Sequence, residues 1–185
     1  MLDSEIIEVS ISGMISPIKD GEAKLEIYHK NKKTTVTVRV AGSTSDFEPD
    51  YVRDVMPVLS KLGCNAGICH GSKDGRNGFK LSLRGYDPIY DIRAFTDDLA
   101  SRRVNIASPD NSLILLKASA SVPHEGGQLT KLGEDYYEIL KGWIANGAKL
   151  EINSPKVTGI DLYPQNPVVQ KIGDKQQMRV IATYA

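Results

Sequence analysis

The chain has 185 residues, of which 41% are hydrophobic and 25% are charged. Its 23 basic residues (Lys and Arg) balance its 23 acidic ones, so no overall charge would draw it to nucleic acid or to an anionic membrane. No apolar run approaches the roughly 20 residues that a bilayer-spanning helix needs, which predicts a chain without a membrane span.

The length allows one ordinary domain with a fragment, or two small domains. The first residues carry no secretion signal and read like the interior of a strand. We therefore expect a piece of a longer protein, and this N-terminus carries no information on whether that protein is exported.

Residues 1–42 read as strands joined by turns, with Asn31-Lys32 as a tight hairpin turn. Apolar and polar residues alternate, which predicts strands with one buried and one wet face, typical of an antiparallel sandwich. The alternating apolar residues are Ile7, Val9, Ile11, Leu25, Ile27, Val36, Val38 and Val40.

The middle of the chain, residues 43–150, changes to helical spacing. Apolar residues from Tyr51 to Leu62 predict a helix with Asp50 as its N-cap and Pro57 as a kink or stagger. A short extended segment is expected over Phe79–Leu83.

Two more helices are predicted in this part, followed by strands. One begins at Ser108 and runs to Lys117, and an amphipathic one spans Glu134 to Asn146, where Gly147 ends it. Residues 151–185 alternate again and predict two more strands.

Both cysteines, Cys64 and Cys69, lie close together, and His70 follows the second directly. Two thiols and an adjacent imidazole favour a c-type haem, because the sulfurs bond the porphyrin while the histidine ligates the iron. The usual gap between the cysteines is two residues, and here it is four. A structural zinc site with one more histidine, a small disulfide, or a pair of free thiols remain alternatives.

Residues from about Phe47 to Ala148 resemble the cytochrome c-like domains of large planctomycete-type proteins. The matching segments are Asp54–Leu59, Cys69-His70-Gly71, Gly78–Leu81, Ser112–Leu115, Pro123-His124 and Leu140–Ile144. In such proteins the haem domain is often inserted among bacterial immunoglobulin-like domains, and residues 1–42 and 151–185 look similar to the second and first halves of such a domain.

The resemblance implies an α+β chain: a mainly α cytochrome c-like haem domain, 43–150, between β segments that form an Ig-like β-sandwich. Because 1–42 would be a second half and 151–185 a first half, closure needs either a circular permutation within one chain or strand exchange between two. We expect a monomer, with a strand-swapped dimer as the alternative.

The resemblance also points to the second axial ligand. Where small cytochromes supply a methionine, this chain has Pro123-His124 and no methionine nearby. We expect His124 to complete bis-histidine ligation with His70, against the alternative of a surface loop histidine. If His124 were not a ligand, a five-coordinate haem sensor or peroxidase would be the alternative function.

Other residues are weaker candidates for haem contact. Phe79, Leu113 and Trp143 are expected to line the haem, although ordinary core positions explain them equally well. Arg84, together with Arg76 and Lys80, is a candidate partner for the haem propionates, with a solvated loop as the alternative.

These expectations define an electron-transfer module with one covalent haem c and no catalytic residues of its own. Its expected partners are redox proteins or other haem domains of the parent chain. Since haem is attached outside the cytoplasm, the parent protein is expected in the periplasm or at the cell surface. The alternative is a structural or adhesive Ig-like fragment whose insert is held by zinc or a disulfide.

Overall fold

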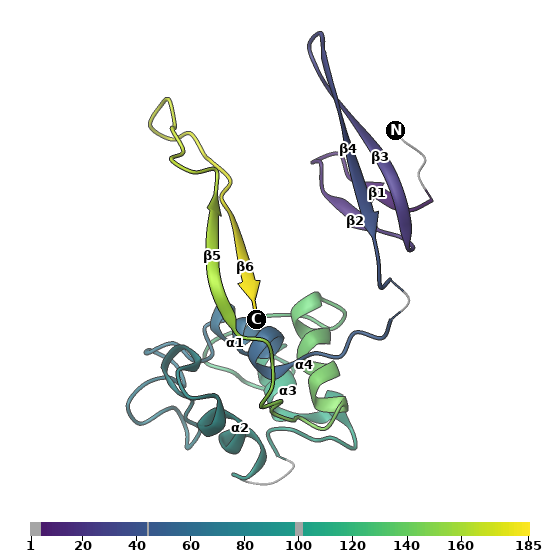
Figure 1. The fold of residues 1–185 in the computed structure, drawn as a ribbon. Coiled ribbons are helices and arrows are strands. Elements are labelled where there is room, and N and C mark those ends of the chain that lie inside the picture. Colours follow the sequence, from purple (N-terminus) through teal and green to yellow (C-terminus); the bar gives the residue numbers. More distant parts are fainter. Residues whose placement is uncertain (1–4, 44, 99–101) are drawn as a thin grey trace. The chain divides into compact units, whose positions relative to one another are not determined.

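The computed structural model describes residues 5–43, 45–98 and 102–185. Its chain divides into two compact units, Met1–Phe47 and Glu48–Ala185 (Figure 1). The first unit contains the predicted β segment 1–42. The second holds most of the predicted haem domain together with residues 151–185.

The first unit consists of two antiparallel strand pairs. Strand β1 (Ile7–Val9) pairs with β2 (Ile15–Pro17), and β3 (Gly21–His29) pairs with β4 (Lys32–Val40). The β3–β4 turn falls at Lys30 and Asn31, one residue earlier than predicted, and Lys30 takes a positive φ of 53° there.

The β3–β4 hairpin has one apolar and one polar face, as the alternation predicts. Leu25 lies opposite Val36 on the apolar face. On the other face Glu22 lies opposite Arg39, and the two form an ion pair of 2.8 Å. Opposite charges placed across from one another stabilise such a pair of strands.

The first helix of the second unit confirms the helix predicted from Tyr51. A wide π-helical turn, Tyr51–Val55, runs directly into α1 (Met56–Lys61). Asp50 caps it, since its Oδ1 accepts a hydrogen bond of 2.7 Å from the Arg53 amide. Pro57 is the second residue of α1 and has no N–H, so it cannot donate a hydrogen bond back into the π-helical turn that precedes it.

The structure adds a helix that the sequence did not predict, α2 (Pro88–Thr96). Asp87 caps it by accepting a hydrogen bond of 3.0 Å from the Tyr90 amide. The extended segment predicted just before it is reduced to an isolated bridge between Arg76 and Phe79, followed by a 3₁₀ turn at Leu83–Gly85.

The last two helices differ in how closely they match prediction. The expected helix from Ser108 is split, because Ser112 is extended between a 3₁₀ turn and α3 (Leu113–Ala118). Helix α4 (Asp135–Ala145) confirms the predicted amphipathic helix, with Gly147 at φ 94° beyond its end.

Helices α1, α3 and α4 gather around one apolar core (Figure 1). Burial of this apolar surface is the main favourable contribution to folding of the second unit. Its largest fully buried apolar side chains are Trp143, Tyr51, Phe95, Leu59, Leu81, Leu115, Leu140, Ile144 and Val55.

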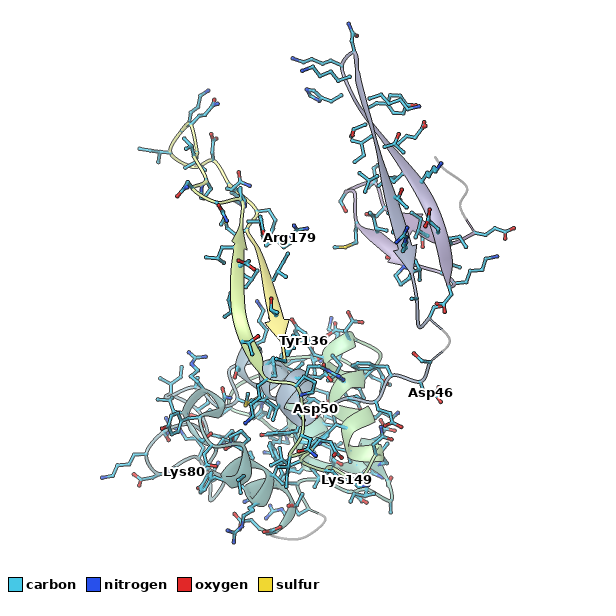
Figure 2. All side chains as sticks on the ribbon, viewed as in Figure 1. Asp46, Asp50, Lys80, Tyr136, Lys149 and Arg179 are labelled. Carbon is cyan, nitrogen blue, oxygen red and sulfur yellow. The ribbon has the colours of Figure 1, made fainter. Side chains whose placement is uncertain are left out.

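Strand β5 (Val157–Tyr163) pairs antiparallel with β6 (Arg179–Tyr184), and every residue of both strands is exposed. Figure 2 shows the side chains along this hairpin, with Arg179 labelled. Across the described ranges the strands form three separate two-stranded sheets, so the Ig-like sandwich stays a prediction. Among the same residues, no helix has the length and apolar character needed to cross a membrane.

Candidate functional site

The loop that carries both cysteines starts where α1 ends. The Cys64 amide donates to Leu59 O of the helix at 2.9 Å, and the His70 amide donates back to Cys64 O at 3.0 Å. This second hydrogen bond closes the loop, so Cys64 and His70 lie side by side in spite of the longer gap between the cysteines. The four-residue spacing is therefore compatible with a compact site.

Asn65 and Gly71 explain why this loop holds its shape. The Asn65 side chain is only 1% exposed, and its Nδ2 donates to Ser60 Oγ at 2.8 Å, which ties the loop to α1. A Cβ at position 71 would lie 2.1 Å from the Asn65 carbonyl oxygen. The loop can therefore close only over a glycine.

Cys64 and Cys69 are both free, half-buried thiols. Burial raises the pKa of Cys64 to about 11, with a further contribution from the nearby Cys69. Cys64 is thus a protonated thiol near neutral pH. Within the described parts of the chain, no three His, Cys, Asp or Glu side chains are grouped closely enough to hold a metal ion, so the zinc alternative has no third ligand there.

His70 is held by the segment that follows it. Its Nδ1 lies 3.0 Å from Phe79 O, and the two rings lie 4.7 Å apart, centroid to centroid. Because a carbonyl oxygen can only accept, Nδ1 carries the proton of the neutral ring and Nε2 keeps its lone pair. This is the tautomer that a metal-binding histidine with a backbone partner adopts.

His124 repeats this arrangement in the loop before α4. Its Nδ1 lies 2.9 Å from Gly127 O, which again leaves the lone pair on Nε2. The two histidines lie close enough to interact. Burial, above all, lowers the pKa of His70, the hydrogen bond with Phe79 opposes this, and electrostatic interactions with His124, Arg103 and Arg76 lower it further. His70 is therefore neutral near pH 7.

The predicted lining residues occupy different depths. Phe79 is half-buried against His70, whereas Trp143 is 2% exposed and donates from Nε1 to Lys149 O at 2.9 Å. Phe95 separates the two, with ring centroids 5.2 Å from Phe79 and 5.9 Å from Trp143. Trp143 is thus a residue of the hydrophobic core behind the site.

Leu113 is half-buried at the start of α3, and Arg84 is exposed. The Arg84 amide donates to Asn65 O at 3.1 Å, which places this residue beside the cysteine loop. The other two basic candidates already bind backbone carbonyls. Arg76 reaches Ile68 O at 3.1 Å, and Lys80, labelled in Figure 2, reaches Lys73 O at 2.7 Å.

Two buried charged residues near the site were not predicted from the sequence. Arg103 is 6% exposed and stands 4.5 Å over the Phe79 ring, but in the sequence it reads as half of a solvated Arg102-Arg103 pair. Asp91 is buried on α2, where it accepts from both the amide and the hydroxyl of Ser82 at 2.5 and 2.8 Å. The signal that could have found Asp91 is Asp87-Pro88, an N-cap followed by proline.

Apolar side chains beside the thiols stay uncovered. Ile68 is 81% exposed and Leu83 is 54% exposed, and Leu83 Cδ1 would lie 3.7 Å from a Cβ at Gly67. Free thiols, two histidines with an available Nε2 and uncovered apolar residues together fit the edge of a covalently held haem.

Comparisons with protein-family models, with curated proteins and with solved structures find no match to this chain.

Proposed function

We propose that the chain is a c-type cytochrome domain that carries one covalent haem and serves single-electron transfer within a larger protein. The observation that carries this proposal is the pairing of two free thiols with a neighbouring imidazole whose Nδ1 is bound by Phe79 O. A disulfide would account for the thiols but not for that orientation of His70, and a zinc site, which would use the same histidine tautomer, has no third ligand grouped with it among the described residues.

Cys64 and Cys69 would bind the haem through thioether bonds. Each thiol would add across one vinyl group, with its sulfur bonded to one vinyl carbon and its hydrogen carried to the other. The addition consumes no oxidant or reductant. Since this attachment takes place outside the cytoplasm, we infer that the parent protein resides in the periplasm or at the cell surface.

His70 and His124 would bind the haem iron through Nε2. A bound haem would supply the redox-active iron, and two imidazoles would favour a lower potential than a histidine and a methionine. The backbone carbonyls of Phe79 and Gly127 keep both rings in the ligating tautomer. Because two histidines of the chain would bind the iron, we infer an electron carrier without an open catalytic site.

The remaining contacts follow from where the side chains lie. Phe79 and Leu113 are half-buried and would cover the ring, with Trp143 supporting them from the core. Arg84 is exposed beside the cysteine loop and would pair with a propionate. The reaction partners would be redox proteins or other haem domains of the parent chain.

Single-cysteine variants test the attachment. In a host that matures c-type cytochromes, the unmodified chain should show the pyridine haemochrome spectrum of two thioether bonds. Cys64→Ala and Cys69→Ala should each shift it to that of one thioether bond or lose the haem. The double variant should lose all covalent haem, and haem retained covalently by the double variant would overturn the proposal.

A further inference from the structure

Arg103 is a buried cation whose hydrogen bonds go mainly to backbone carbonyls. One guanidinium nitrogen donates to Ala94 O at 2.7 Å and to Asp98 O at 3.2 Å, and the other donates to Gly78 O at 2.8 Å. The nearest carboxylate, that of Asp98, is 3.5 Å away on an exposed side chain. Burial of a charge costs free energy unless hydrogen bonds satisfy it. The planar guanidinium of Arg103 therefore fixes the backbone segments whose carbonyls it binds.

The segment that Arg103 fixes is the one that orients His70. Gly78, which accepts from Arg103, directly precedes Phe79, and the guanidinium carbon stands 4.5 Å from the centre of the Phe79 ring. Phe79 O in turn accepts from the Arg76 amide at 2.9 Å and faces His70 Nδ1 at 3.0 Å. Arg103 thereby holds both the ring and the carbonyl that contact His70.

We propose that Arg103 is the positioning residue for His70: it holds Phe79 so that the Phe79 carbonyl keeps His70 in the Nδ1–H tautomer, with Nε2 directed to a ligand. The inference rests on the proposed function only in naming haem iron as that ligand. Lysine cannot take this role, because a single ammonium does not present two separate sets of donors together with a planar face for the Phe79 ring.

The tautomer of His70 is measured in the full chain without haem, by long-range nitrogen–proton correlation spectra of the imidazoles. The unmodified chain should show His70 only as the Nδ1–H tautomer. In Arg103→Gln, His70 should become an exchanging mixture of both tautomers, whereas His124 should keep Nδ1–H because Gly127 O is untouched. Arg93→Gln, which removes an exposed arginine that pairs with Asp97, should leave both histidines unchanged.

Several results would overturn the inference. One is a folded Arg103→Gln chain in which His70 keeps the Nδ1–H tautomer. Another is a His70 in the Nε2–H form in the unmodified chain, which decides the matter even if the glutamine variant fails to fold. Because no haem is present, these results stand apart from the proposed function, which fails instead if the matured chain carries no covalent haem.

A haem-loaded chain gives a second readout. Loss of a buried positive charge beside the ligand disfavours the reduced state, so Arg103→Gln should lower the midpoint potential relative to Arg93→Gln. Equal potentials in these two variants would contradict a role of Arg103 at the site.

Discussion

At the scale of single residues, the two histidines of the candidate site are oriented by the same kind of contact with the backbone. Each ring is fixed by a backbone carbonyl at Nδ1, Phe79 O for His70 and Gly127 O for His124, at 3.0 and 2.9 Å. The third histidine, His29, is exposed on β3 and serves as a natural control.

Replacement of His124 tests the sixth ligand. His124→Ala should convert a low-spin ferric haem into a high-spin one, because one strong-field ligand is lost. His124→Met should keep six-coordination and raise the midpoint potential. Absorption and low-temperature electron paramagnetic resonance spectra read the spin state. His29→Ala should change neither property, and a low-spin spectrum in His124→Ala would exclude His124 as a ligand.

Asp91 joins α2 to the segment before it. Asp91→Ala would leave the Ser82 amide and hydroxyl without their acceptor, which should cost about 1–3 kcal/mol of unfolding free energy. Asp97→Ala, on an exposed position beyond the same helix, should cost less than about 0.5 kcal/mol. Urea titration followed by fluorescence of Trp143, the single tryptophan, measures both, and equal losses would contradict the assigned role.

Asp91 also predicts a pH dependence of stability. Burial raises its pKa, while the Ser82 hydrogen bonds oppose that rise. The folded state therefore holds the proton more tightly than the unfolded state, and Asp91's contribution to stability falls as pH rises from 3.8 through the raised pKa. Urea titrations of the unmodified chain and of Asp91→Asn across this pH range measure the effect. The free energy of unfolding of the unmodified chain should fall relative to that of Asp91→Asn as the pH rises. A constant difference between the two would contradict the assigned pH dependence.

At the scale of elements, the turn that closes the cysteine loop depends on one glycine. Gly71→Ala would place a Cβ 2.1 Å from Asn65 O, so the loop must shift. We expect a loss of about 1–3 kcal/mol in unfolding free energy and less covalent haem.

Gly67→Ala is the matched control in the same loop, because its Cβ would meet only Leu83 at 3.7 Å, an ordinary contact. Urea titration and haem content per chain measure both variants. Similar behaviour of the two would show that the loop does not need the close approach at Gly71.

The elements differ in how far the sequence predicts them. The helix at Tyr51 and helix α4 carry a cap or a terminating glycine as well as an apolar stripe, and both are confirmed. Helix α2 was missed because its signal is local, a cap and a proline at Asp87-Pro88, on a segment with exposed apolar residues such as Ile89. The predicted extended segment at Phe79 is mostly turns, since short apolar alternation does not fix strand pairing.

The residues of the candidate site also differ in how far the sequence predicts them. Cys64, Cys69 and His70 are adjacent in sequence, so their grouping could be predicted, whereas the proximity of His124 depends on the fold of the whole second unit. Arg103 could not be found, because its burial comes from Phe79, Gly78 and Ala94, which lie far from it in the sequence.

At the scale of the whole molecule, two hairpins present apolar faces. In β3–β4 this face includes Leu25 opposite Val36, and in β5–β6 it includes Leu162 opposite Val180. Exposed strand pairs of this kind are prone to association unless they are covered. The Ig-like sandwich expected from the sequence would cover faces of this kind and stays a prediction.

Sedimentation velocity distinguishes a monomer from a strand-exchanged dimer. We expect a monomer whose sedimentation coefficient does not change with concentration. Leu162→Lys would place a charge on the apolar face opposite Val180 and should dissociate any strand-exchanged dimer, whereas Asp161→Lys, on the other face of the same strand, should not. A stable dimer of the unmodified chain would favour strand exchange instead.

The proposed function depends above all on one haem bonded through sulfur to Cys64 and Cys69. The most direct test is the intact mass of the full chain, purified from a host that matures c-type cytochromes and denatured in acid to remove any non-covalent haem. We expect a single species heavier than the polypeptide by one haem, with a Soret band that survives the extraction. A colourless chain at the polypeptide mass, with two thiols that react with an alkylating reagent, would contradict it.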